Sequence, residues 1–174
     1  SYNKTELQHF GEWIQKINRP AVKLLKGMRA TTAVTNIGMQ LEYFPFSIRE
    51  FSSTIGKFAP FVSLGGQFSF YNAKNFSKLG SLKVPENVFP KYFLPSDGRP
   101  HGFSTETGYV WSVVGSIGTR YKLSPLEDLM IDLRVQYFYS DWVDGLNPNK
   151  DLFHENRAND YLGWFNVGYI YYIQ

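Results

Sequence analysis

Oxygen-bearing side chains gather in residues 141–158, which read DWVDGLNPNKDLFHENRA. Four of them are candidate ligands of a metal ion: Asp144, Asn147, Asn149 and Asp151. Carboxylate and amide oxygens bind Ca²⁺, and the last three alternate as the first ligands of a calcium loop do. However, Leu152 stands where that loop needs glycine, and Ala158 where it needs glutamate. The sequence therefore favours a turn whose Asp and Asn side chains hydrogen-bond to the backbone. Ca²⁺ binding is the alternative, and no other cofactor is predicted.

The three histidines do not form a catalytic or metal-binding pattern. His9, His101 and His154 are spread over separate polar segments without ligand spacing. Ser104 follows His101 closely, but no nucleophile motif surrounds it. We therefore expect a protein that is not an enzyme, with a hydrolase or acyltransferase as the weakest alternative.

A second group of ionised and amide side chains recurs at alternate positions of extended segments. Its members are Gln40, Glu42, Arg120, Asp132, Arg134 and Gln136. Successive residues of a strand point to opposite faces, so this spacing places all of them on one face of a sheet. Opposite charges on one face can pair, and pairing offsets the cost of removing each charge from water. The sequence predicts a polar network on that face.

Five segments show the alternation that would carry this network: residues 31–44, 58–72, 108–123, 129–140 and 159–174. One face of the last segment, NDYLGWFNVGYIYYIQ, is wholly apolar apart from tyrosine hydroxyls. Aromatic residues expected to face lipid or to form a girdle include Tyr137, Tyr139, Phe165, Tyr169 and Tyr171. The sequence contains no helix large enough to cover such faces, so we expect lipid to cover them rather than a second layer of protein.

The composition agrees with strands that cross a membrane. Aromatic residues make up 18% of the chain, as expected for girdles at two membrane interfaces. No apolar run is long enough for a membrane-spanning helix. The net charge of +3 is too small to indicate nucleic-acid binding, and the absence of cysteine excludes disulfides and thiolate metal sites. We predict an all-β, antiparallel, up-and-down transmembrane β-barrel, with a soluble sandwich as the alternative.

Residues 1–30 are the least strand-like part of the chain. Hydrophobic residues from Leu7 to Ile17 recur at helical spacing, with Thr5 as the N-cap and Pro20 after the run. We expect one short amphipathic helix in an extracellular loop, followed by the barrel strands in residues 31–174. The polar residues 73–106 and 141–158 are expected to form further extracellular loops, because the periplasmic turns of such barrels are short.

Strand direction and strand number follow from the same rule. The short connection SPLED at residues 124–128 would be periplasmic, so the first strand would run inward from the outside. Single-chain bacterial barrels have even strand numbers, so we expect about three further strands upstream of Ser1, to give eight, or strands from another chain. A barrel of about eight strands has room only for side chains, which predicts a plugged lumen.

Several segments resemble a known family when taken together. They are LQHFGEWI (residues 7–14), NIGMQLEYFPF (36–46), GTRYKL (118–123), DLRVQYFYSDWVDGLNPNKD (132–151) and NDYLGWFNVGYIYYI (159–173). These are similar to small outer-membrane β-barrels of Bacteroidota related to the PorG-like proteins of the type IX secretion system. The resemblance covers the C-terminal two-thirds of such a barrel. It implies insertion by the barrel-assembly machinery and association with secretion or gliding components.

The sequence and the resemblance lead to one expected function and one alternative. We expect a non-enzymatic scaffold or docking component of an envelope complex in the bacterial outer membrane, and the resemblance implies that this complex is the type IX secretion system. Its expected partners are the lipid bilayer, lipopolysaccharide and other proteins of the complex, but not nucleic acid. The alternative is a barrel whose long outer loops bind a ligand or a partner at the cell surface.

Overall fold

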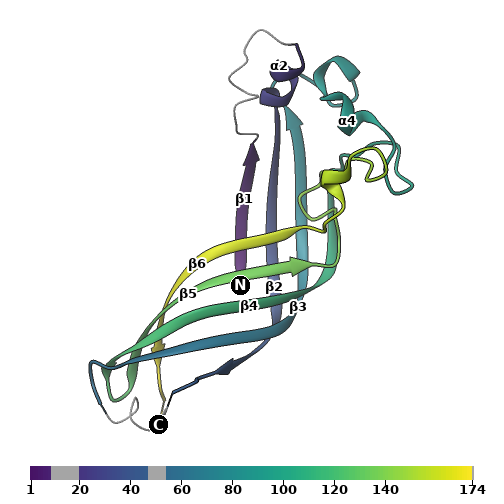
Figure 1. The fold of residues 1–174 in the computed structure, drawn as a ribbon. Coiled ribbons are helices and arrows are strands. Elements are labelled where there is room, and N and C mark those ends of the chain that lie inside the picture. The colour runs from purple at the N-terminus through teal and green to yellow at the C-terminus, as the bar shows by residue number, and fades with distance from the viewer. Residues whose placement is uncertain (9–19, 47–53, 174) are drawn as a thin grey trace. The chain divides into compact units, whose positions relative to one another are not determined.

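The computed structural model of the chain describes residues 1–8, 20–46 and 54–173. In these ranges the strands are β1 (Tyr2–Gln8), β2 (Met28–Tyr43), β3 (Phe58–Ser77), β4 (Glu106–Ser124), β5 (Glu127–Phe138) and β6 (Tyr161–Tyr171). They form one sheet in which each strand pairs with the next along the chain (Figure 1). The printed pairs at both edges, β1 with β2 and β5 with β6, are antiparallel. The prediction of an all-β, antiparallel protein is confirmed.

The N-terminal segment differs from the expectation. Residues Tyr2–Gln8 form a strand, and Thr5, predicted to cap a helix, lies in its middle opposite Thr32. A β-branched residue in an alternating segment packs well on a pleated surface, which explains why strand pairing prevails there. Since the described residues form six strands rather than the five predicted, an odd strand number no longer supports the expectation of about three further strands. Most of the predicted helix lies outside the described residues.

A helix occurs in the segment that follows the predicted helix. Pro20, which was expected to end the predicted helix, is the first residue of this one. Helix α2 spans Pro20–Gly27. Proline is well tolerated in the first helical turn, because its missing N–H has no intrahelical acceptor there. The segment Pro20–Gly27 therefore leads into β2 as a helix rather than as an extended connection.

The remaining strands match the predicted segments, with shifted ends. β3 continues to Ser77, so the predicted loop 73–106 is shorter, and it contains the 3-10 helix η1 (Pro85–Asn87) and the helix α4 (Pro90–Phe93). β4 ends at Ser124 and β5 begins at Glu127, which leaves a turn of two residues. In the β5–β6 pair Asp132 lies opposite Asn166 and Leu133 opposite Phe165. This register places polar residues together on one face and apolar residues together on the other.

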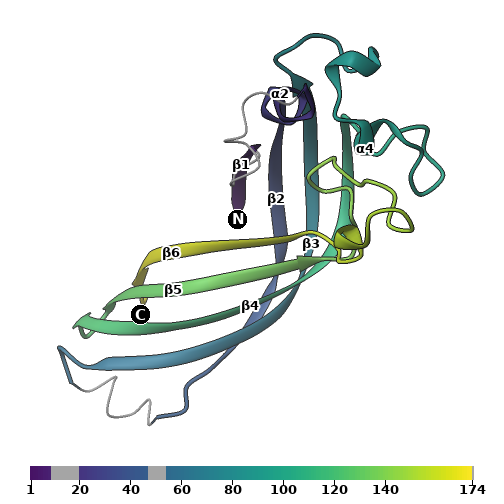
Figure 2. The ribbon, with the colours of Figure 1, turned by 45° about the horizontal axis from the view of Figure 1, so that its top comes forward.

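The chain divides into two compact units. The loop-bearing unit comprises Ser1–Ile37, Ser69–Val110 and Phe138–Asp160. The strand unit comprises Gly38–Phe68, Trp111–Tyr137 and Tyr161–Gln174. Within the loop-bearing unit, α2 and α4 lie beyond the ends of the strands (Figure 2). Met28, Val88 and Tyr92 form an apolar core there, against which Phe89, Phe93, Phe103 and Leu146 pack.

Burial in the strand unit is the reverse of that in an ordinary globular sheet. Polar residues such as Ser112, Asp132 and Gln136 are buried, whereas Leu133, Val135 and Phe165 are 53%, 50% and 65% exposed. Large contiguous apolar surfaces are rare on soluble monomers and mark interaction with a membrane or with another protein. Among the described residues, no helix has the length and apolar character needed to cross a membrane.

Candidate functional site

The first candidate site is the buried polar face of the strand unit, and Arg120 is the centre of one cluster on it. The Arg120 guanidinium forms an ion pair with the Glu42 carboxylate and donates to the Tyr172 hydroxyl at 3.1 Å. Tyr172 donates to Asp128 Oδ2 at 2.6 Å, and Lys122 Nζ lies 3.1 Å from Asp128 Oδ1. Residues of β2, β4, β5 and the end of β6 are thus joined in one chain of polar contacts. Lys122 and Asp128 are buried, so their contact replaces the water that these two charges lose.

A second cluster lies further along β5. Arg134 donates from Nε to Asp132 Oδ1 at 2.7 Å and from Nη2 to Asp132 Oδ2 at 3.1 Å. Asn166 on β6 donates to Asp132 Oδ2 at 3.1 Å. A two-point contact between a guanidinium and a carboxylate fixes both side chains more strongly than a single hydrogen bond does. Gln136 extends the polar face by donating to Ser112 Oγ at 2.7 Å.

The structure brings most of the predicted network together on this face. Glu42, Arg120, Asp132, Arg134 and Gln136 all take part in the contacts described above. The other predicted member, Gln40, is half-buried, and its Nε2 has no hydrogen-bond partner among the described residues.

Sequence reasoning missed Asp128 and Tyr172. The sequence predicts that Asp128 belongs to the connection at residues 124–128, although it precedes Asp132 by four positions and so shares its face. That spacing was the available signal. Tyr172 lies just beyond the end of β6, but it follows Asn166 by six positions, so the alternation of the predicted strand 159–174 indicates the polar face for it as well.

The predicted lipid-facing or girdle residues lie on the opposite, exposed side. Phe165, Tyr169 and Tyr171 alternate with half-buried residues along β6. Tyr137 and Tyr139, near the end of β5, are also exposed. Tyr169 donates to the Glu127 carboxylate at 2.5 Å, so its polar end has a partner while its ring stays on the outer face. Tyrosines with an apolar body and a hydrogen-bonded tip suit a membrane–water boundary.

The predicted metal ligands take part in turns and loop contacts. Asp144 Oδ1 accepts the Leu146 amide at 2.7 Å, and Asn149 Oδ1 accepts the Asp151 amide at 2.9 Å. Asn147 is fully buried and donates to Asp97 Oδ2 at 2.9 Å. The Asp144 and Asn149 contacts are the backbone-satisfying turns that the sequence favoured, whereas the Asn147 side chain connects two loops. Within the described ranges, no cluster of three or more histidine, aspartate or glutamate side chains has the arrangement of a metal site.

Asp144 and Asp160 lie close together where the loop after β5 leads to β6, and Asp141 is near enough to influence both. Asp160 Oδ2 accepts the amides of Val143 and Asp144 at 2.8 and 3.1 Å. Burial raises the pKa of Asp160 to about 6 despite these two amides, and the nearby Asp141 carboxylate adds to the rise. Burial, followed by repulsion from Asp160, holds the pKa of Asp144 well above its ordinary value. Asp144 and Asp160 therefore hold their protons to a higher pH than isolated aspartates do.

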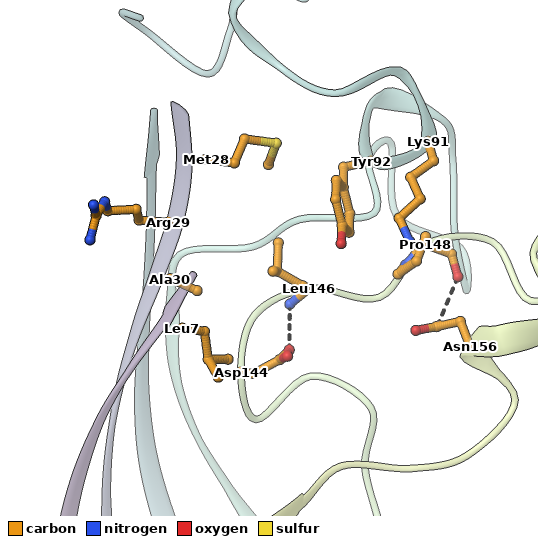
Figure 3. A pocket seen from close by; sticks show the side chains of 10 residues that line it. All are labelled: Leu7, Met28, Arg29, Ala30, Lys91, Tyr92, Asp144, Leu146, Pro148 and Asn156. Atoms are coloured by element: carbon orange, nitrogen blue, oxygen red, sulfur yellow. Dashed lines mark hydrogen bonds between the residues drawn. The ribbon is translucent and has the colours of Figure 1, made fainter. Parts of the chain in front are cut away.

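A cavity of about 230 Å³ lies beside this cluster in the loop-bearing unit (Figure 3). Its wall combines apolar side chains from Leu7, Met28 and Leu146 with the polar groups of Lys91 and Asp144. In Figure 3 the Arg29 side chain points away from the other labelled residues. A mostly apolar hollow with a few polar groups is the usual form of a small-ligand site.

His101 and Ser104 occupy separate environments. His101 Nδ1 is 2.9 Å from the Phe93 carbonyl oxygen, and the imidazole ring stacks on Phe103 with 5.1 Å between centroids. The Ser104 amide donates to the Gly145 carbonyl at 2.8 Å. His9 lies outside the described residues. No hydrogen bond joins His101 to Ser104 in the part of the chain that the structure describes, so the two do not form a nucleophile–base pair there.

The chain matches no protein-family model, and neither a characterised protein nor a solved structure is significantly similar to it.

Proposed function

We propose that this chain forms part of the wall of a transmembrane β-barrel in the bacterial outer membrane. The observation that supports this most is the reversed burial of the strand unit, in which Asp132 is buried while Leu133 and Phe165 are exposed. Water would be a poor solvent for that outer face, whereas lipid covers it without a second protein layer. The paired charges of the other face suit a lumen filled by side chains.

Within that membrane, the protein acts as a scaffold or docking component rather than as an enzyme. The contacts that join Glu42, Arg120, Tyr172, Asp128 and Lys122 connect several strands on the polar face, which favours a structural role over transport of a solute. The ordered loops of the loop-bearing unit, which pack around Met28, Val88 and Tyr92, provide a shaped surface for a partner. The resemblance to PorG-like barrels directs this proposal towards the type IX secretion machinery.

The test is fractionation of the native protein followed by identification of its partners. We expect the protein in the outer-membrane fraction, soluble only with detergent, and accompanied by a reproducible set of envelope proteins after mild crosslinking. A chain that stays in aqueous solution without detergent would contradict the membrane proposal. A membrane chain that always purifies alone would contradict the scaffold role.

Ligand binding by the outer loops is a second candidate function. The cavity lined by Met28, Tyr92, Asp144 and Leu146 favours it, because these residues come from separate segments that together enclose a hollow (Figure 3). A Leu146→Trp substitution would fill the cavity. If the loops act through this hollow, the substitution should abolish binding of the ligand or partner and leave membrane assembly unchanged.

A further inference from the structure

A second hollow in the loop-bearing unit, of about 360 Å³, lies on the outer side of β1, β2 and β3. Its lining residues alternate along the strands, which places them on one face: Tyr2, Lys4, Thr31, Ala33, Asn72, Lys74 and Phe76. Thr31 and Ala33 on the central strand have short side chains, whereas the two flanking strands contribute long ones. The result is a groove with a floor of small residues and walls that carry lysine and aromatic groups.

The groove carries positive charge. Lys4 and Lys74 are both exposed, and neither forms an ion pair with a described residue. Glu6, the nearest acidic residue along β1, has its charge matched by Arg29 at 2.6 Å. Lys4 and Lys74 lie on β1 and β3, on either side of β2 and offset by two residues along the strands, so their backbones are about 12 Å apart. Long flexible stems allow both ammonium groups to approach one phosphate group between them.

Apolar side chains adjoin the two lysines on the same face. Tyr2 and Phe76 are exposed beside the groove, and Phe70 and Ile37 are exposed on the same side of β3 and β2. A ligand that matches this surface has an anionic headgroup and attached hydrocarbon chains. A soluble phosphate would use the lysines but not the exposed aromatic and aliphatic groups.

We propose that this groove binds the phosphorylated headgroup of an outer-leaflet glycolipid, whose acyl chains lie against the exposed face of β2 and β3. The inference rests on the proposed location in the outer membrane, and it assigns the lipid contact to Lys4 and Lys74. Charge complementarity and the adjoining apolar face favour this occupant over an acidic protein segment, which would not need the hydrocarbon-facing residues.

The test is native mass spectrometry of the intact, detergent-solubilised protein titrated with diphosphorylated lipid A, and with the same lipid after its phosphates are removed. The double variant Lys4→Gln/Lys74→Gln should bind the phosphorylated lipid about thirtyfold more weakly, since each lysine near a lipid surface contributes about a fivefold preference. The matched control Lys23→Gln/Lys83→Gln removes two exposed lysines of the same unit that do not line the groove, and it should bind as the unchanged protein does. Ala33→Leu, which fills the floor and keeps the charges, should weaken binding as well.

Equal affinity for both lipids, or equal weakening in the two double variants, would overturn the proposed groove. An acidic peptide that displaced the phosphorylated lipid and bound more tightly would overturn it in favour of a protein partner. Either failure leaves the membrane proposal intact as long as the protein still requires detergent. If the protein is soluble without detergent, the membrane proposal fails as well.

Discussion

Arg120 on β4 pairs with Glu42 on β2 across the strand that separates them, β3. Strands two apart in a sheet are separated by about 10 Å, so the contact must cross the face of β3. The guanidinium carbon of Arg120 lies 5.9 Å from the ring centre of Phe61 on β3 and 5.1 Å from that of Phe44. Aromatic faces attract a cation and limit its contact with water. Arg120 therefore connects three strands on the polar face of the strand unit.

The first prediction concerns this ion pair. Arg120→Met should lower the free energy of unfolding in detergent by about 1–3 kcal/mol, because Glu42 would keep a partly buried charge without its partner. The double variant Glu42→Gln/Arg120→Met should recover part of that loss. Thermal unfolding followed by circular dichroism or by gel mobility measures both, and the double-mutant cycle isolates the pair.

The Glu6–Arg29 pair is the matched control, because it is more exposed. The Glu6 side chain is 55% exposed, compared with 26% for Glu42. Glu6→Gln should change stability by less than about 1 kcal/mol. If Arg120→Met and Glu6→Gln lowered the free energy of unfolding equally, the Arg120–Glu42 contact would be an ordinary surface pair. The proposed polar network would then lose its central contact.

The second prediction compares two neighbouring glycines of β3. A Cβ on Gly65 would collide with the Met39 carbonyl oxygen and the Gln40 backbone, whereas a Cβ on Gly66 would meet nothing within 4 Å. Gly65→Ala should therefore separate β2 from β3 and destabilise the protein by about 2 kcal/mol or more, as overpacking in a core does. Gly66→Ala should be neutral or slightly stabilising, because it restricts the unfolded chain. The same thermal unfolding measurement distinguishes them, and equal midpoints for the two variants would contradict the close approach of the strands.

The sequence was informative wherever burial follows a period of two. Glu42, Arg120, Asp132 and Arg134 were placed on one face by alternation alone, and the structure joins them in pairs. Alternation determines the face but not the partner: the spacing could not show that Arg120 contacts Glu42 two strands away or that Tyr172 links Arg120 to Asp128. Those contacts depend on register and side-chain length, which one sequence does not specify.

The sequence was least informative in short and irregular segments. Leu7 to Ile17 fits a helical spacing, yet Tyr2–Gln8 pairs with β2, because the backbone hydrogen bonds of a neighbouring strand outweigh a weak local preference. The fully buried Asn147, which links loop segments through Asp97 and Asn156, was read only as a metal or turn residue. Local spacing carries no signal for such contacts between distant loops.

The third prediction tests whether lipid covers the exposed face. Leu133→Arg places a charge on that face. In a membrane barrel, an arginine on the lipid face near the bilayer centre costs about 2–4 kcal/mol of stability. We expect defective membrane assembly, measured as loss of the heat-resistant folded form in outer-membrane extracts. Leu152→Arg, at an exposed residue of the loop before β6, should assemble normally. Normal assembly of Leu133→Arg would indicate that water, not lipid, contacts this face.

The last prediction concerns the pH dependence of the loop between β5 and β6. Burial raises the pKa of Asp160 to about 6 in the folded state, from its ordinary value of 3.8. Between these two values the folded state binds more protons than the unfolded state, so the free energy of unfolding falls as the pH rises. The stabilisation is fully present below pH 3.8 and is lost as the pH passes through about 6. The size of the effect is at most about 3 kcal/mol, and Asp144 shifts in the same direction.

Hydrogen exchange of the peptide that contains Val143 and Asp144 measures this effect directly, because both amides donate to Asp160. After correction for intrinsic exchange rates, protection should increase as the pH falls from 7 to 5. Asp160→Asn keeps an oxygen acceptor without the charge, so it should raise protection at pH 7 and reduce the pH dependence. Asp151→Asn, at an exposed residue of the same loop, should leave the pH dependence as it is. If protection instead decreased towards pH 5, the two amides would depend on an ionised Asp160, and charge-assisted hydrogen bonding would outweigh burial at this carboxylate.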